Sequence, residues 1–112
     1  MKKQILAVGD SFTYGDELVD LQDAWPHVLG KKINAEVVNL GRPGCSNDRM
    51  FRLTFEHLID FNNHKPDLVI IGWTSPGRME FADDAGHYDV WPGYSGNLFT
   101  RDSCNWRQEL TN

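Results

Sequence analysis

Short apolar runs alternate along the first two thirds of the chain with longer stretches in which apolar residues recur every three or four positions. The runs occupy residues 4–8, 36–39 and 67–72, and they are rich in β-branched side chains. Runs of this length and composition are typical of strands that are buried on both faces of a parallel sheet. We therefore expect three parallel strands.

Helical patterns fill the two gaps between these runs. The first helix begins at residues 25–26, because proline is accepted in a first helical turn, and it closes at residues 30–32. The second helix is capped by Asn47 or Ser46 and stops before Pro66. Its apolar residues recur at helical spacing and predict one face toward the sheet: Phe51, Phe55, Leu58 and Ile59.

The alternation of strands and helices predicts right-handed crossovers and an α/β fold, a parallel-sheet three-layer α/β/α sandwich of the flavodoxin-like type. The pattern dissolves from residue 81 onward, so we expect irregular chain over residues 83–112. A sheet of only three strands has exposed edges. The expectation for residues 1–112 is therefore a single domain that forms the amino-terminal portion of a larger one. The larger domain is either truncated in this chain or completed by another polypeptide or a second copy.

Composition narrows the possible partners. The chain has 112 residues and a net charge of −5, and its lysines and arginines form no long run, which argues against nucleic-acid binding. The apolar run after Met1 is too short for a signal peptide, and no segment reaches the roughly 20 apolar residues of a membrane span. We expect a cytoplasmic protein. Cys45 and Cys104 lack metal-binding spacing, so they are expected to be reduced thiols, and no metal or cofactor is predicted.

Ser11 stands where the first predicted strand gives way to a turn. Gly9 tolerates the backbone angles of a sharp exit, and ligands of parallel α/β sheets gather beyond the carboxyl ends of the strands. A hydroxyl at this place is suited to act as a nucleophile. The purely local alternative is a turn in which Asp10 and Ser11 cap the following backbone.

The residues around Ser11 also resemble a known enzyme family. Residues 8–15 (VGDSFTYG) closely resemble the first signature of the SGNH, or GDSL-type, hydrolases, which are serine esterases and acylhydrolases. Residues 37–46 resemble the second signature, in which the glycine matched by Gly44 lends its N–H to the oxyanion hole. Residues 69–75 fall where the family has Gly-x-Asn-Asp, but Thr74 replaces the asparagine that is the third oxyanion donor.

The resemblance covers about residues 4 to 80 and implies an SGNH-type fold. It also implies hydrolysis of carboxylic esters, such as O-acetyl groups on carbohydrate, through an acyl-enzyme on Ser11. The hydroxyl of Thr74 can donate one hydrogen bond in place of the family's asparagine, and Ser75 is the adjacent alternative. Either residue can instead be a loop residue without a role in the site.

The catalytic base of this family comes from an Asp-x-x-His near the end of a longer domain. Residues 84–87 have that spelling, but they follow the third predicted strand closely, where the family would still have strands to come. A chance match is the competing interpretation. His87 is nevertheless the candidate base within this chain, since the other histidines lie on or beside the predicted helices.

Three further residues are candidates for substrate contact. Asp10 can instead orient its loop by accepting backbone N–H bonds, and Asn47 can instead cap the helix. Arg78 can bind a substrate carboxylate or pair with Asp83 or Asp84.

Two other functions fit parts of the sequence. A catalytically inactive SGNH-like module would use the same crevice for binding or assembly, and the absence of a clear base favours it. A flavodoxin-like loop would hold a phosphate with Ser11 and Thr13. The acidic residues Asp10, Asp16 and Glu17 argue against the phosphate loop, because no nearby cation offsets their charge.

Overall fold

The computed structural model describes residues 2–90, and the structure is dominated by one parallel sheet. Strands β1 and β2 and helices α1 to α3 come first along the chain, followed by β3 and then by β4 and β5. The bounds are β1 (Lys3–Val8), α1 (Ser11–Tyr14), the 3-10 turn η1 (Leu21–Asp23), α2 (Trp25–Ile33), β2 (Ala35–Asn39), α3 (Asn47–Ile59), β3 (Leu68–Ile71), β4 (Met79–Asp83) and β5 (Gly86–Val90).

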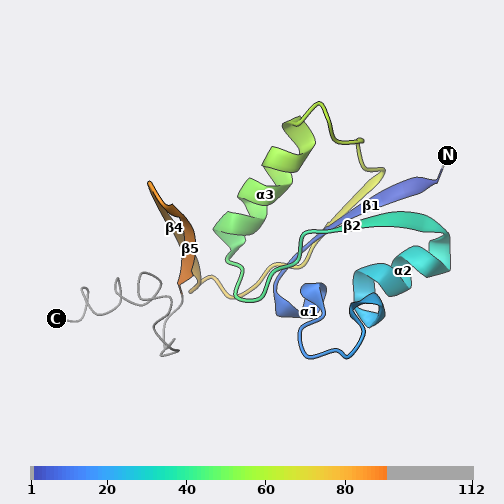
Figure 1. Ribbon diagram of the computed structural model, residues 1–112, viewed down its shortest axis with the longest axis horizontal. Coiled ribbons are helices and arrows are strands. Elements are labelled where there is room, and N and C mark those ends of the chain that lie inside the picture. Colours follow the sequence, from blue (N-terminus) through green and yellow to red (C-terminus); the bar gives the residue numbers. More distant parts are fainter. Residues whose placement is uncertain (1, 91–112) are drawn as a thin grey trace.

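The main sheet has the order β2-β1-β3, and both pairings are parallel. The chain moves from β1 to one neighbour through α2 and then crosses to the other side of β1 through α3. Right-handed crossovers in opposite directions place their helices on opposite faces of a sheet, and Figure 1 shows α2 and α3 on opposite sides of the strands. The predicted α/β sandwich is confirmed.

The central strand β1 forms the core because both of its faces are covered. Leu6 and Val8 are fully buried and pack with Cys45 and Met50 on the α3 side. Ile5 and the residues that alternate with Leu6 point to the opposite face, toward α2, and they are buried as well. An unbroken apolar strand is therefore what this position in the sheet requires.

Helix α3 turns a different face to the sheet from the one that the sequence predicted. Met50 is fully buried, and Leu53 packs against the same core cluster. Phe51 is 67% exposed, and its ring stacks on Phe55 with centroids 6.4 Å apart. The prediction that Phe51, Phe55 and Ile59 face the sheet was wrong, because the helix has two apolar stripes and buries the other one.

The ends of α3 settle which residue caps it. The hydroxyl oxygen of Ser46 accepts a hydrogen bond from the Arg49 backbone N–H at 3.1 Å, which makes Ser46 the N-cap. Asn47 is the first helical residue, and the helix already ends at Ile59, before the predicted stop at Pro66. The capping role that was open between Ser46 and Asn47 therefore belongs to Ser46.

A two-stranded antiparallel hairpin, β4–β5, follows the sheet and was not predicted. Asp83 closes its turn by accepting hydrogen bonds from the backbone N–H groups of Ala85 and Gly86 at 2.7 and 3.1 Å. The hairpin lies beside the amino-terminal part of α3 (Figure 1). Residues 83–112 were expected to be irregular, but β5 occupies part of that range, and residues 91–112 lie outside the described structure.

Among residues 2–90, no helix is both long and apolar enough to cross a bilayer.

Candidate functional site

The loops that follow β1, β2 and β3 meet at the carboxyl edge of the sheet and are joined by hydrogen bonds. The Arg42 backbone N–H, in the loop after β2, donates to the Gly9 carbonyl after β1 at 3.0 Å. The Gly72 N–H, at the end of β3, donates to the Val8 carbonyl at 2.8 Å. The loops that carry Gly44 and Thr74 are therefore both bonded to the end of the central strand, from which the chain continues to Ser11.

Ser11 is the first residue of the one-turn helix α1 and is partly exposed. The Asp10 carboxylate caps this turn by accepting from the Phe12 backbone N–H at 3.1 Å. Gly9 does not have a positive φ, so the strained exit that was expected there is absent. Glycine is needed for space instead, because a Cβ at Gly9 would overlap the Thr13 side chain.

Neutral hydrogen bonds hold α1 to the neighbouring helix α2 and strand β2. Thr13 is buried, and its hydroxyl oxygen accepts from the Trp25 indole N–H at 3.1 Å. The Asn39 amide donates to the Thr13 carbonyl at 2.9 Å, and its oxygen accepts from the Gly41 N–H at 2.8 Å. Asn39 therefore links the turn that carries Ser11 to the loop after β2. Sequence reasoning did not assign this role to Asn39, although the residue belongs to the stretch that matched the second signature.

Gly44 occupies a tight turn formed by residues 42–45. The Cys45 N–H donates to the Arg42 carbonyl at 3.1 Å, and Gly44 has a φ of 77°. Proline at the second position and glycine with positive φ at the third are the signature of a type II turn. The local sequence therefore fixes the conformation in which the Gly44 N–H is presented.

A buried carboxylate from β5 lies against both ends of this turn. Asp89 accepts a hydrogen bond from the backbone of Ser46, which follows the turn. Its carboxylate oxygens lie 3.5 Å from the Arg42 Nε and 2.8 Å from the Arg49 Nε, and the Arg49 and Asp89 side chains are only 5% and 8% exposed. Burial raises the pKa of Asp89, and the charges of Arg49 and Arg42 and the Ser46 hydrogen bond offset only part of this effect.

Glu80, on β4, extends the same charge cluster. Its carboxylate lies 2.8 Å from the Arg49 Nε, and it accepts two hydrogen bonds from Arg52 at 3.0 and 2.8 Å. Burial opposes ionisation of Glu80, but the Arg52 hydrogen bonds and the charges of the two arginines outweigh it, so the pKa of Glu80 is lowered. Ion pairs thus hold the hairpin to the start of α3.

Thr74 is held by the side chain of Asn47. The Asn47 amide oxygen accepts from the Thr74 backbone N–H at 2.8 Å, and its amide nitrogen donates to the Thr74 carbonyl at 3.0 Å. This pair of bonds connects the loop after β3 to the first turn of α3. The Asn47 side chain acts here on the protein backbone, and the Thr74 side chain remains partly exposed.

Arg78 pairs with a different carboxylate from those that the sequence suggested. Its Nη1 lies 3.7 Å from the Asp10 carboxylate, next to Ser11, rather than beside Asp83 or Asp84. Asp83 is engaged in the hairpin turn.

His87 lies in β5, opposite Ala82, and residues 84–85 form the turn of the hairpin. Its Nδ1 is 3.7 Å from the Glu80 carboxylate. Within residues 2–90, which include all four histidines of the chain, no hydrogen bond joins a histidine to Ser11. Figure 1 shows the hairpin set apart from α1. The structure therefore gives His87 a carboxylate neighbour but no contact with the candidate nucleophile.

Cys45 is buried in the core behind the turn. Burial, with the nearby Asp89 charge, raises the pKa of its thiol to about 11, so the thiol stays protonated at neutral pH. In the described part of the chain, no group of three histidine, cysteine, aspartate or glutamate side chains could hold a metal ion. Cys104 lies outside the described residues.

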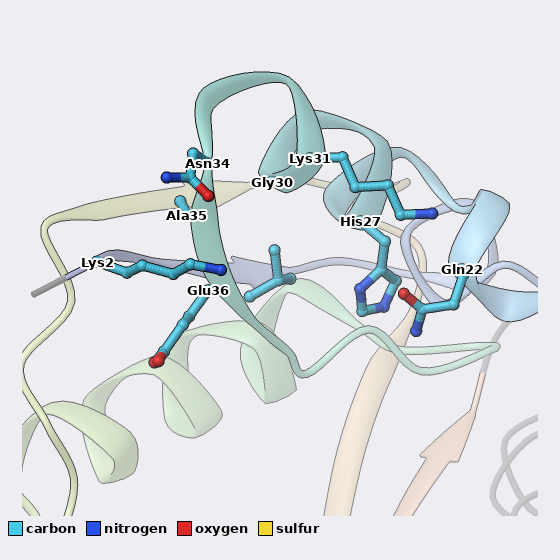
Figure 2. A pocket seen from close by; sticks show the side chains of 9 residues that line it. Lys2, Gln22, His27, Gly30, Lys31, Asn34, Ala35 and Glu36 are labelled. Carbon is cyan, nitrogen blue, oxygen red and sulfur yellow. The ribbon is translucent and has the colours of Figure 1, made fainter.

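A cavity of about 650 Å³ lies elsewhere, along α2 and the free edge of β2. Figure 2 shows Lys2, Asn34 and Glu36 at one end and His27 and Lys31 toward the other. None of the candidate site residues lines it. The candidate site residues lie instead at the carboxyl edge of the sheet, because the loops that carry Ser11, Gly44 and Thr74 extend from that edge.

A family model covers most of the chain. It matches residues 13–108 and is described as a family of unknown function, DUF6071. The chain belongs to the DUF6071 family. A search of curated proteins found no match for this DUF6071 member.

Three solved structures that are similar to this DUF6071 chain are of one esterase. The crystal structure of AlinE4, described as an SGNH-hydrolase family esterase, is 28% identical, with a TM-score of 0.55. Two AlinE4 mutants, one of an aspartate and one of a serine, give TM-scores of 0.54 at 28% and 27% identity. Each match covers 68% of this chain and 42% of that chain, so the DUF6071 chain spans less than half the length of AlinE4. The likeness shows an SGNH-like fold.

Proposed function

We propose that this protein is a serine hydrolase of the SGNH type that acts on carboxylic esters through an acyl-enzyme on Ser11. One observation carries the proposal. Ser11 starts a helical turn at the end of the central strand, and the loops with Gly44 and Thr74 are hydrogen-bonded to the end of that strand or to each other. The similarity to an SGNH-family esterase supports the same interpretation.

The proposed reaction begins with attack of the Ser11 Oγ on the ester carbonyl carbon while a base takes the hydroxyl proton. Negative charge then develops on the carbonyl oxygen. The backbone N–H groups of Ser11 and Gly44 and the Thr74 hydroxyl donate to it. Collapse of this intermediate releases the alcohol, and water later releases the acid from Ser11.

We assign the remaining residues by their contacts. Arg78 lies beside Asp10 next to Ser11, where its guanidinium can bind an anionic or polar part of the substrate. Asp10 orients the turn that carries Ser11, and Asn47 orients Thr74. A small acyl ester or an acylated carbohydrate is the substrate class that we propose.

The base has two candidate sources. His87 has Glu80 beside its Nδ1, and a carboxylate in that position stabilises an imidazolium. The other source is a second polypeptide or a second copy of this chain that completes the sheet. His87→Gln should abolish turnover if His87 of this chain or of a second copy is the base, and it should leave turnover unchanged if another polypeptide supplies the base.

The test uses hydrolysis of p-nitrophenyl acetate and labelling by a fluorophosphonate. Ser11→Ala is expected to lower turnover by at least about 10⁴-fold, as removal of a catalytic serine does, and to abolish labelling. Ser75→Ala is the matched control for labelling, since Ser75 is an exposed serine next to Thr74 whose hydroxyl accepts from the Gly77 N–H. A folded wild-type chain that neither turns over the ester nor labels at Ser11 contradicts a hydrolase whose base lies in this chain or in a second copy of it.

One observation favours a second candidate, a catalytically inactive SGNH-like module that binds a partner or ligand at the same edge. No histidine in residues 2–90 is hydrogen-bonded to Ser11. Retained binding of a partner without fluorophosphonate labelling would identify this function.

A further inference from the structure

We propose that Asp89 is a positioning residue for the Gly44 N–H, and that the β4–β5 hairpin is therefore part of the machinery that stabilises the oxyanion. This inference rests on the proposed function for its catalytic consequence. Its structural content, that Asp89 fixes the turn at residues 42–45, stands on contacts that are independent of any activity.

The contacts of Asp89 bracket Gly44 in the sequence. The carboxylate holds the Arg42 side chain, at the first position of the turn, at 3.5 Å. It also accepts the hydrogen bond from the backbone of Ser46, directly after the turn. Gly44 lies between these two attachment points, so a single carboxylate restrains the turn on both sides.

The same turn touches the segment of the proposed nucleophile. The Arg42 N–H that donates to the Gly9 carbonyl belongs to the residue whose side chain Asp89 holds. A shift of Arg42 would therefore move the Gly44 N–H relative to the chain that leads into Ser11. The direction of this N–H matters because an oxyanion donor acts only when it is aimed at the developing charge.

The burial of Asp89 argues against an incidental surface pair. Ionised carboxylates are rarely buried unless they are paired. Here the cation is Arg49, which is itself buried and faces Asp89 at 2.8 Å. Most of the hairpin's side chains outside this cluster are partly or fully exposed, including Met79 and Phe81. Apolar packing of the hairpin therefore does not by itself explain why the Asp89 carboxylate is buried.

The experiment compares three variants of the full chain. Asp89→Ala removes the charge and the acceptor for Ser46, whereas Asp89→Asn removes the charge but keeps a side chain of the same size with one acceptor oxygen. Asp84→Asn is the matched control, because Asp84 is an exposed aspartate in the turn of the same hairpin. The measurements are kcat and KM on p-nitrophenyl acetate and amide hydrogen exchange at each residue by NMR.

We expect Asp89→Ala to lower kcat by about 10- to 100-fold with little change in KM, since loss of one oxyanion donor costs about 10²–10³ in turnover and misalignment costs part of that. Asp89→Asn should restore part of the loss, and Asp84→Asn should match the wild type. Exchange should rise at Cys45, whose N–H closes the turn, and at Ser46, while the β1 amides stay protected.

Unchanged exchange at Cys45 and Ser46 in Asp89→Ala overturns the proposal whatever the rates are, because the Cys45 N–H closes the turn and the Ser46 N–H is bonded to Asp89. A rise in exchange throughout the sheet also overturns it, because Asp89 would then support the whole fold. If the wild type shows no turnover but exchange at Cys45 and Ser46 rises locally, the structural claim stands and the hydrolase proposal fails for this chain by itself. Should Asp89→Ala not fold, Arg42→Gln tests the same restraint from the exposed side, where Arg42 is 58% exposed.

Discussion

The segments that carry the proposed nucleophile and the proposed oxyanion donor are held by different kinds of interaction. The turn at Ser11 is fixed mainly by neutral hydrogen bonds, through Thr13 to Trp25 and Asn39. The turn at Gly44 takes its conformation from its own residues, but it is held in place by a charged group, the Asp89 carboxylate, which is paired with the buried Arg49. Neutral bonds do not respond to pH, whereas a buried carboxylate does. The stability of the Ser11 turn should therefore depend less on pH than the stability of the Gly44 turn.

The largest expected effect comes from removing a charge from the cluster of Arg49, Glu80 and Asp89 beside the Gly44 turn. Arg49→Met removes the cation that both Asp89 and Glu80 face and leaves those carboxylates partly unpaired. We expect a loss of about 3–5 kcal/mol in the free energy of unfolding, as for other buried pairs that lose one partner. Urea denaturation measures it. Arg52→Met is the control, because Arg52 is more exposed and should cost clearly less. Equal losses in the two variants would show that burial of Arg49 is not what matters.

Removing neutral hydrogen bonds at the Ser11 turn should lower the free energy of unfolding by a smaller amount that does not depend on pH. Asn39→Ala removes the bonds to the Thr13 carbonyl and the Gly41 N–H. Leaving such groups unsatisfied costs about 1–3 kcal/mol. The loss should be the same at pH 5 and at pH 8 when unfolding is measured in urea. A loss that changes strongly with pH would remove the distinction between the two turns.

The smallest expected effect is the pH dependence of the free energy of unfolding. The carboxylates of Glu80 and Asp89 change it in opposite directions. The pKa of Glu80 is lowered in the folded state, so its stabilisation is present above the unfolded pKa and is lost as the pH falls through the folded pKa. The pKa of Asp89 is raised, so its ionisation reduces stability as the pH rises between its unfolded and folded pKa.

The free energy of unfolding should consequently pass through a shallow maximum in mildly acidic solution, because ionisation of Glu80 stabilises the folded state as the pH rises and ionisation of Asp89 destabilises it. Thermal unfolding across pH 3–8 measures it. Glu80→Gln should weaken the acid limb, and Asp89→Asn should weaken the limb toward neutral pH. A profile that neither substitution alters would contradict this account.

The apolar pattern predicted the sheet but not the orientation of the longer helix. Buried runs such as residues 4–8 are apolar on both faces, so they identify a central strand without knowledge of its neighbours. Helix α3 has one apolar stripe through Phe51 and Phe55 and a second through Met50 and Leu53. Periodicity detects a stripe but cannot choose between two. The sheet buried the stripe whose members fit against Leu6 and Val8.

The hairpin was missed because its inward side chains include charged ones. Glu80 and Asp89 point into a buried cluster, although carboxylates in a strand are normally taken to mark its solvent face. Their partners, Arg42, Arg49 and Arg52, lie far away in the sequence. A local pattern therefore could not show that these charges would be paired.

The sequence alone determined the parallel strands, the position of Ser11 at the end of the first one, and the type II turn at Gly44, since each depends on side chains within a few residues of one another. The tertiary structure decided which face of α3 is buried, which carboxylate Arg78 meets, and that Asp89 reaches the Gly44 turn. These outcomes depend on which distant groups meet in space. Burial then determines how strongly charges brought together in this way interact, and neither property is encoded by local spacing.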